Sequence, residues 1–236
     1  MIPKIVHYCW LSGDPVPKSM QDCMETWKKI LPDYEFILWD LKRFDIGSSV
    51  WAREAFEHGK YAFASDYIRL YAINLMGGIY LDMDVEMLKP FDDLLDREYF
   101  LGYENNRFEA PEMAVFGAEK GCRWVRTLLE HYQDRHFVQP DGSLDTKPLP
   151  HVAKEVFAVK GENVTLMPSE YFSPKPFIHK SFKTTENTYC IHQFADCWIP
   201  WEQRVERRFW DLLGLPPHRF MLHFDNFLLR VFHIHR

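Results

Sequence analysis

The sequence predicts an α/β protein built around a central, mostly parallel sheet. Two observations lead to this fold class. Short apolar runs with the composition of strands alternate with longer segments whose apolar residues recur at helical spacing. Glycine and proline mark the turns between them. Because strand–helix–strand units close into sheets covered by helices, this alternation favours a layered α/β fold.

The first half of the chain contains the clearest of these units. In chain order they are a strand at 4–10, a helix at 18–31, a strand at 34–39, helices at 50–57 and 61–76, and a strand at 79–87. Pro32 ends the first helix, and the pair Gly77-Gly78 ends the third. Polar and apolar residues alternate strictly over the last segment, which predicts one continuous strand there.

The second half is less regular. It is predicted to contain strands at 99–103, 113–116 and 189–194 and helices at 123–131 and 152–159. The proline-containing stretch between these two helices, at 139–150, is predicted to be a loop, and its length is typical of functional loops.

Composition excludes several classes of protein. With 236 residues, 47% hydrophobic and 26% charged, the chain has the balance of one ordinary globular domain with a small appendage. The net charge of −6 and the mixing of acidic and basic residues argue against a nucleic-acid-binding protein with a broadly basic surface. The five cysteines include no CxxC pair, so neither a disulfide framework nor a zinc knuckle is expected.

Two aspartates in the strand at 79–87 are the first candidates for chemistry. A side-chain period of two places Asp82 and Asp84 on one face, together with Tyr80 and Glu86, with the two aspartate Cα atoms roughly 6.5–7 Å apart. Carboxylates that close repel each other unless a cation lies between them, and Mg²⁺ or Mn²⁺ prefers such oxygen ligands. A simply solvated acidic face is the alternative, and for an isolated Asp-x-Asp it is the favoured one.

Residues of the preceding predicted helix, at 61–76, make a functional site more favoured than a simply solvated acidic face. Asp66 and Arg69 are three residues apart and therefore share a helix face. They could form an ordinary surface ion pair, or a carboxylate and a guanidinium that together grip neighbouring sugar hydroxyls. Glycine at Gly77 and Gly78 would permit a ligand close to the backbone, although a helix C-cap explains this pair equally simply.

Together these residues resemble the signature of the family 32 type of glycosyltransferases, whose sugar-binding region contains a DXD motif. The matching elements are Ser65-Asp66-x-x-Arg69 and Gly77-Gly78-x-Tyr80-x-Asp82-x-Asp84, with flanking resemblance at 2–10 and at 191–198. Yeast-type initiating α-mannosyltransferases and bacterial capsular and surface-polysaccharide glycosyltransferases share this signature, and clostridial glucosylating toxins share it more distantly. The resemblance implies a GT-A-like, Rossmann-type nucleotide-sugar-binding fold.

The resemblance also implies roles for individual residues. The residues implied to contact the donor are Trp10, Ser65, Asp66, Arg69, Gly78, Tyr80, Asp82 and Trp198. The implied metal ligands are Asp82, Asp84 and His192. The implied catalytic residues are Asp66, Arg69 and Asp84. Trp10 would stack on the nucleotide base, unless it is a core tryptophan, and His192 has the alternative of an ordinary strand histidine. By position alone, the acceptor candidates are Tyr103, Glu104, Asn105 and Asn106.

The implied activity is retaining transfer of a sugar from a nucleotide-sugar donor, with a UDP-sugar favoured, to a saccharide or lipid-linked saccharide acceptor. Mn²⁺ or Mg²⁺ would assist by neutralising the departing diphosphate, and the product would be α-linked, as in polysaccharide biosynthesis. Two alternatives stay open. A metal-dependent phosphohydrolase also uses Asp-x-Asp, but places it after the first strand and before a threonine. A non-catalytic nucleotide-sugar-binding module would bind the donor without turning it over.

Residues 203–236 are predicted to form a C-terminal helical tail after a catalytic domain at 1–202. The tail combines arginines with bulky apolar residues, which is typical of a basic amphipathic helix. It could contact the anionic inner face of a membrane peripherally, or pack on the catalytic domain, which is the favoured reading. We expect a cytoplasmic location, since no signal-like segment opens the chain and no apolar run of about 18 residues occurs.

Overall fold

The computed structural model describes residues 1–105, 110–174 and 183–195. Its centre is a five-stranded sheet with the strand order β2-β1-β3-β6-β5. The strands are β1 (Ile5–Cys9), β2 (Glu35–Trp39), β3 (Gly78–Leu81), β5 (Tyr99–Asn105) and β6 (Ala110–Ala118). β1 pairs in parallel with β2 and β3, whereas β6 is antiparallel to both β3 and β5. Every strand of this sheet except β6 therefore points the same way, so the mostly parallel sheet is confirmed.

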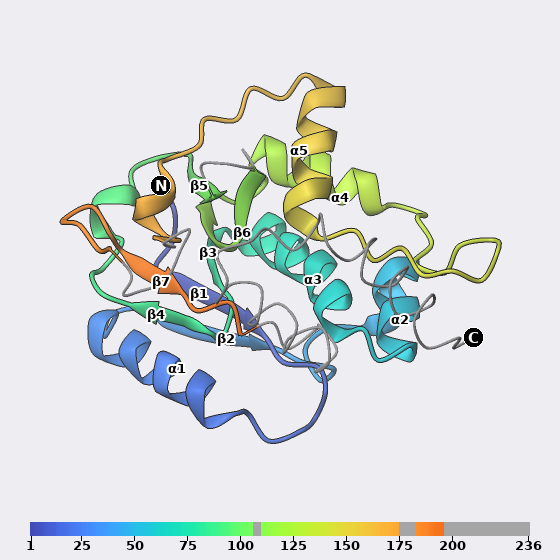
Figure 1. The fold of residues 1–236 in the computed structure, drawn as a ribbon, viewed down its shortest axis with the longest axis horizontal. Helices are drawn as coiled ribbons and strands as arrows, with labels where there is room; N and C mark the ends of the chain where they lie inside the picture. Colours follow the sequence, from blue (N-terminus) through green and yellow to red (C-terminus); the bar gives the residue numbers. More distant parts are fainter. Residues whose placement is uncertain (106–109, 175–182, 196–236) are drawn as a thin grey trace, which may run out of the picture. The chain divides into compact units, whose positions relative to one another are not determined.

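Helices cover both faces of the sheet (Figure 1). They are α1 (Lys18–Ile30), α2 (Val50–Glu57), α3 (Tyr61–Met76), α4 (Arg123–Tyr132) and α5 (Leu149–Lys160), with short 3₁₀ turns at Ile46–Ser48, Asp92–Leu94 and Ser169–Tyr171. One apolar core joins α2, α3, α4 and α5 to the sheet face that presents Tyr80 and Phe116. A second core joins α1 to the opposite face, which presents Ile79 and Leu81. No helix in the described ranges is long and apolar enough to cross a bilayer.

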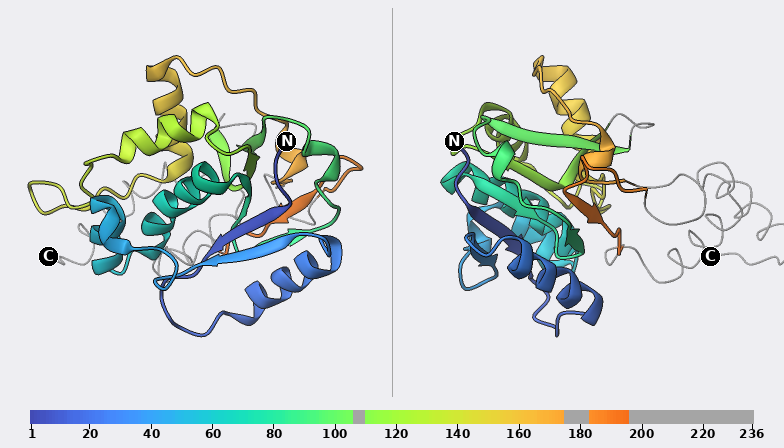
Figure 2. Two further views of the ribbon diagram at one scale, coloured as in Figure 1. Left: turned by 180° about the vertical axis from the view of Figure 1, so that it is seen from behind. Right: turned by 90° about the vertical axis from the view of Figure 1, so that its left-hand side faces the viewer.

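A second, two-stranded sheet lies on the α1 side. It pairs β4 (Val85–Met87) with β7 (Cys190–His192) in antiparallel fashion, and Figure 2 shows the two strands side by side. Trp27 of α1 donates its indole N–H to the carbonyl of Val85 at 2.6 Å, which ties this small sheet to the helix. The pairing brings His192, at the end of β7, next to the segment that contains the two aspartates.

The prediction of one continuous strand at 79–87 is wrong. β3 ends at Leu81, and residues 82–84 form a turn in which the Val85 amide donates to the Asp82 carbonyl at 3.1 Å. The chain then continues as β4 in the other sheet. The alternation of polar and apolar residues is real, but it is shared between two short strands because Val85 and Met87 pack into the α1-side core.

The two glycines between α3 and β3 are required by the fold. Gly77 ends the helix with φ of +70°, and its amide donates to Ile73 O. Gly78 has φ of +111°, and a Cβ there would lie 2.7 Å from the Ile5 carbonyl oxygen and 3.1 Å from His7 Nε2. β1 and His7 fill the space beside Gly78, so packing alone requires a glycine there, and a donor contact at Gly78 stays a prediction.

Candidate active site

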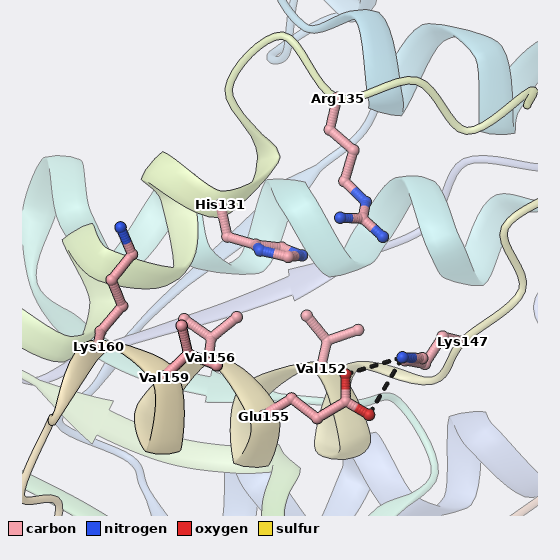
Figure 3. Close-up of a pocket in the computed structure, with 8 residues that line it drawn as sticks. All are labelled: His131, Arg135, Lys147, Val152, Glu155, Val156, Val159 and Lys160. Carbon is pink, nitrogen blue, oxygen red and sulfur yellow. Dashed lines mark hydrogen bonds and ion pairs between the residues drawn. The ribbon is translucent and has the colours of Figure 1, made fainter.

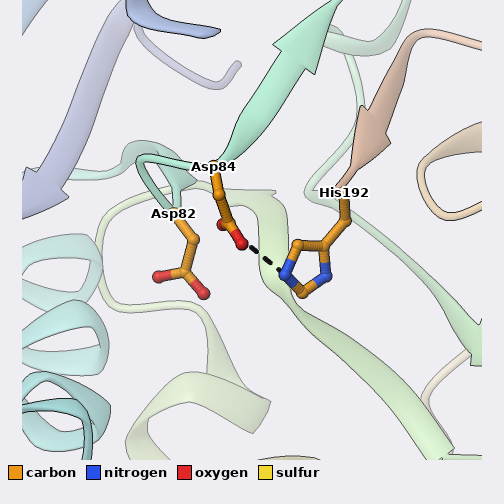
Figure 4. A group of neighbouring side chains, drawn as sticks. All are labelled: Asp82, Asp84 and His192. Atoms are coloured by element: carbon orange, nitrogen blue, oxygen red, sulfur yellow. Dashed lines mark ion pairs between the residues drawn. The ribbon is translucent and has the colours of Figure 1, made fainter. Parts of the chain in front are cut away.

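The two aspartates of the Asp-x-Asp motif lie in the turn that joins β3 to β4. Asp82 follows the carboxyl end of β3, and its amide donates to the Ala114 carbonyl of β6 at 2.9 Å. Asp84 directly precedes β4, whose first residue, Val85, pairs with His192 of β7. The turn and the strand pairing thus bring Asp82, Asp84 and His192 together, with one ligand atom of each within 4.8 Å of the others (Figure 4).

Asp84 is held by the chain that follows β7. Its Oδ2 accepts a hydrogen bond from the Ala195 amide at 2.8 Å, and its main-chain carbonyl accepts one from the Gln193 amide at 3.0 Å. Its Oδ1 lies 3.6 Å from His192 Nε2. One carboxylate oxygen of Asp84 is therefore fixed by the protein, while the other faces the space shared with His192.

The imidazole of His192 lies between carboxylates. Its Nδ1 is 3.3 Å from Oε1 and 3.4 Å from Oε2 of Glu112, a buried residue of β6, while its Nε2 faces Asp84. Burial by itself lowers the pKa of His192, but Glu112, Asp84 and Asp82 outweigh it and raise this pKa to about 9. Without a metal, a protonated His192 supplies the positive charge among these acids, and a bound cation would replace that proton.

Arg69 of α3 lies behind Asp82. Its Nη1 is 3.4 Å from Asp82 Oδ2 and donates to the Met113 carbonyl at 2.7 Å, while its Nη2 is 3.1 Å from Asp66 Oδ1 and donates to Ser65 Oγ at 3.1 Å. Arg69 is only 6% exposed, so the alternative of a surface ion pair is wrong. With its N–H groups engaged by the protein, Arg69 orients Asp66 and Asp82 in this structure, and gripping a sugar would require it to exchange a partner.

Tyr80 completes the support of Asp82 from the β3 side. Its hydroxyl donates to Asp82 Oδ1 at 2.8 Å, and the Arg69 guanidinium lies 4.6 Å from the centre of its ring. Tyr80 is 1% exposed, so the structure places it beneath the aspartate. Asp66, behind Arg69, is also buried, and this burial raises the pKa of its carboxyl to about 7 despite the nearby guanidinium.

Other predicted site residues lie along the same edge of the sheet. Trp10 follows β1, whose carboxyl end neighbours that of β3, and the half-buried ring donates its N–H to the Asp14 carbonyl at 2.8 Å. Tyr103 and Glu104 lie near the carboxyl end of β5, which runs parallel to β3 in direction. Asn105 ends that strand. Trp198 and Asn106 lie outside the described residues, as does the tail at 203–236.

A separate surface pocket lies between α4, α5 and the loop that joins them (Figure 3). Its lining residues are His131, Arg135, Lys147, Val152, Glu155, Val156, Val159 and Lys160. Lys147 is paired with Glu155 at 2.8 Å, and Arg135 with Asp145. None of the predicted donor or metal residues contributes to this pocket, and its principal charges already have protein partners, so we do not assign it a ligand.

Comparison with known proteins identifies the region around the Asp-x-Asp turn. The sequence family described as "Glycosyltransferase sugar-binding region containing DXD motif" matches residues 17–101, which span α1, α3 and both aspartates. The chain matches this family over residues 17–101. The resemblance predicted from the DXD signature is therefore confirmed. His192 and Glu112 lie beyond the matched range, so the structure brings them to the DXD motif independently of that match.

Curated relatives of the DXD region carry the names of sugar transferases. Inositol phosphoceramide mannosyltransferase 3 of Schizosaccharomyces pombe is 30% identical over 162 residues, which cover 63% of this chain and 43% of that protein. Mannosyl phosphorylinositol ceramide synthase SUR1 of Saccharomyces cerevisiae is 30% identical over 105 residues, covering 43% and 27%. An uncharacterized glycosyltransferase, L373, of Acanthamoeba polyphaga mimivirus is 30% identical over 106 residues, covering 42% of each. The chain spans less than half the length of these relatives.

Among solved structures, the PaToxG glycosyltransferase has the same fold. It superimposes with a TM-score of 0.52 over 67% of this chain and 70% of that one, at 18% sequence identity. The GT-A-like, Rossmann-type fold class predicted from the DXD signature is thereby confirmed.

The residues around the DXD turn fit a divalent cation. Two carboxylates and one imidazole are a donor set suited to Mn²⁺ or Mg²⁺, which leaves other coordination positions for water and substrate phosphate oxygens. One ligand atom of each residue lies within 4.8 Å of the others, so the three side chains share one space in which an ion could be held. The site also has the buried partners that orient metal ligands, Arg69 and Tyr80 behind Asp82 and Glu112 behind His192.

Proposed function

We propose that this chain is a retaining glycosyltransferase that transfers a sugar from a nucleotide-sugar donor, with a UDP-sugar favoured, to a saccharide or lipid-linked saccharide acceptor. The observation that carries the proposal is the convergence of Asp82, Asp84 and His192 at the carboxyl edge of the sheet, within 4.8 Å, next to a matched DXD region. Ligands of open α/β sheets bind at that edge. Hexosyl transfer in polysaccharide or glycolipid synthesis agrees with the mannosyltransferase names of the relatives.

The residues of the site have separate roles in the proposed reaction. Mn²⁺ or Mg²⁺ held by Asp82, Asp84 and His192 would neutralise charge on the departing nucleotide diphosphate. Arg69 holds Asp82 from behind, and the Ala195 amide fixes one oxygen of Asp84. Trp10, half-buried at the same edge, offers a ring face to the nucleotide base.

The retaining course needs no dedicated protein base. In a front-face displacement, the acceptor hydroxyl oxygen bonds to the anomeric carbon on the side from which the diphosphate leaves. The departing phosphate oxygen receives the hydroxyl proton as the glycosidic bond to the nucleotide breaks. Product and donor then share the α configuration, as the resemblance to retaining families implies.

A donor panel tests the proposal. Purified full-length chain is incubated with UDP-linked and GDP-linked sugars and Mn²⁺, and released nucleotide is measured with and without EDTA. Release that requires the metal, and that increases when a saccharide or glycolipid acceptor is added, is the expected result. Release of inorganic phosphate from phosphoesters, with no nucleotide from nucleotide sugars, would instead identify a phosphohydrolase. Tight donor binding without turnover in Mn²⁺ would identify a binding module.

We further propose a cytoplasmic enzyme that contacts the inner membrane face peripherally through residues 203–236. The arginines and bulky apolar residues of this segment support the proposal, as do the ceramide substrates in the names of the relatives. Full-length chain should co-sediment with liposomes that contain anionic lipid, but not with neutral liposomes, and high salt should release it. Replacing Arg204, Arg207 and Arg208 with serine should abolish this binding while donor hydrolysis persists. Unchanged binding would discard the membrane role.

A further inference from the structure

Glu112 is a buried acidic residue in the strand β6. All residues of β6 are buried, and Glu112 is 1% exposed, although a charged carboxylate is seldom buried without partners. Its partners include the Ala114 amide, which donates to Oε1 at 2.9 Å, and His192 Nδ1, at 3.3 and 3.4 Å from its two oxygens. Neither oxygen is free to contact a substrate, so the carboxylate acts on the site through His192.

This contact determines which nitrogen of His192 faces the aspartates. An ionised carboxylate only accepts hydrogen bonds, so Nδ1 carries a hydrogen and donates it to Glu112. Nε2 is therefore the nitrogen that turns toward Asp84, 3.6 Å away, in the space that all three ligand residues share (Figure 4).

The imidazole is restrained from two further directions. The ring of Phe194 stacks on it with a centre-to-centre distance of 3.8 Å, and the backbone of His192 is held by its pairing with Val85. Phe194 adopts this position with a φ of +50°, a conformation that non-glycine residues seldom occupy. Glu112 restrains the rotation of the ring about its Cβ–Cγ bond, because its carboxylate is the partner of Nδ1 among the residues that the structure describes.

We propose that Glu112 is a positioning residue of the metal site, which presents Nε2 of His192 to the divalent cation shared with Asp82 and Asp84. The inference rests on the proposed metal-dependent function and adds a residue to it that lies outside the matched DXD region. A carboxylate that binds the far nitrogen of a ligating histidine fixes its tautomer and orientation, and losing such a partner lowers metal affinity about 10- to 100-fold.

Direct binding of Mn²⁺ tests this role without reference to activity. Free Mn²⁺ is measured by electron paramagnetic resonance during titration of the full chain, and the nitrogen coupling of bound Mn²⁺ reports ligation by His192. Glu112→Gln keeps an acceptor for the Ala114 amide but removes the charge, and it should weaken Mn²⁺ binding about 10-fold or more. Glu155→Gln is the matched control, since Glu155 is an exposed acid paired with Lys147, and it should leave the affinity unchanged.

A double-mutant cycle separates positioning from general destabilisation. His192→Ala should weaken binding and abolish the nitrogen coupling, and adding Glu112→Gln to it should cause no further loss, because Glu112 acts through that imidazole. Unfolding in EDTA, followed by circular dichroism, verifies that each variant is folded. Unchanged affinity in Glu112→Gln overturns the proposal, and so does a full additional loss in the His192→Ala background.

The same titration distinguishes this proposal from the proposed function. A wild-type chain that binds Mn²⁺ with the nitrogen coupling, and loses affinity on Glu112→Gln, but turns over no nucleotide sugar, supports the role of Glu112 and contradicts the glycosyltransferase. A chain that binds no Mn²⁺, yet releases nucleotide from donors in EDTA, overturns the role of Glu112 and leaves sugar transfer standing.

Discussion

Arg69 Nη1 lies 3.4 Å from Asp82 Oδ2, so a helix-borne guanidinium supports the first aspartate of the DXD turn from inside the protein. The same guanidinium is 3.1 Å from Asp66, which is buried, whereas the Asp82 side chain is 29% exposed. Because Arg69 belongs to α3 and lies between these two carboxylates, the position of Asp82 depends on how α3 packs.

Removing Arg69 should therefore cost both stability and activity. Arg69→Met leaves Asp66 buried without its cation, and losing one partner of a buried pair costs about 3–5 kcal/mol of unfolding free energy. Urea unfolding in EDTA measures this cost. The control is Arg53→Met, which removes an exposed partner of Glu57 and should change stability by no more than about 0.5 kcal/mol. An equal effect of the two substitutions would contradict the supporting role of Arg69.

Replacing Asp84 should abolish metal-dependent turnover without unfolding the chain. Asp84→Asn keeps an acceptor for the Ala195 amide but removes the charge that faces the cation, so donor turnover in Mn²⁺ should fall at least about 100-fold. Nucleotide release measures the fall, and the urea midpoint verifies the fold. Asp33→Asn, an exposed aspartate remote from the DXD turn in sequence, is the matched control. Full activity of Asp84→Asn would remove Asp84 from the site.

The buried His7 should make stability depend on pH. Trp39 Nε1 donates to His7 Nδ1 at 3.0 Å, so the hydrogen of neutral His7 sits on Nε2, which donates to the Gly77 carbonyl at 2.9 Å. Burial lowers the pKa of His7 below its ordinary 6.5. The stabilisation that depends on a neutral His7 is fully present above pH 6.5. It is lost as the pH falls toward the pKa of His7 in the folded chain, because only the unfolded chain then binds the proton.

Urea unfolding between pH 7.5 and 5.5 checks this dependence. The stability difference between wild type and His7→Gln should narrow as the pH falls, by at most about 1.4 kcal/mol for each pH unit, since the variant has no imidazole to titrate at that position. His58→Gln, at an exposed histidine, is the control. A constant difference across this range would show that the pKa of His7 is the same in the folded and unfolded chain.

The fold was predictable from sequence where its signals are local. α2 and α3 have the predicted bounds, and each has a nearby terminus signal: the Ser49 hydroxyl accepts from the Ala52 amide at 3.3 Å, and Gly77 ends α3. α5 starts at Leu149, three residues before the predicted helix, because Pro150 is typical of loops but is also compatible with the first turn of a helix.

The site was predictable only in part, because its assembly depends on long-range pairing. The grouping of Asp82, Asp84 and His192 followed from the family resemblance, whereas the single strand expected there is two strands in two sheets. Alternation of polar and apolar residues does not show where a chain passes from one sheet to another. The sequence does not predict a role for Glu112, because β6 is antiparallel to β3 and only this pairing brings the start of β6 to the edge where β3 ends. A lone acid in an otherwise apolar strand was the available signal.

Gly78→Ala discriminates between packing and donor binding at the second glycine of the motif. The new Cβ would lie 2.7 Å from the Ile5 carbonyl oxygen, at a φ of +111°, so the sheet must shift and stability should fall by more than about 2 kcal/mol. Gly13→Ala is the matched control, because Gly13 also has a positive φ, +74°, but has no atom within 4 Å of the added carbon. It should cost about 1–2 kcal/mol from the backbone alone. If Gly78→Ala keeps wild-type stability and raises only the KM for the nucleotide sugar, Gly78 contacts the donor and the packing requirement is contradicted.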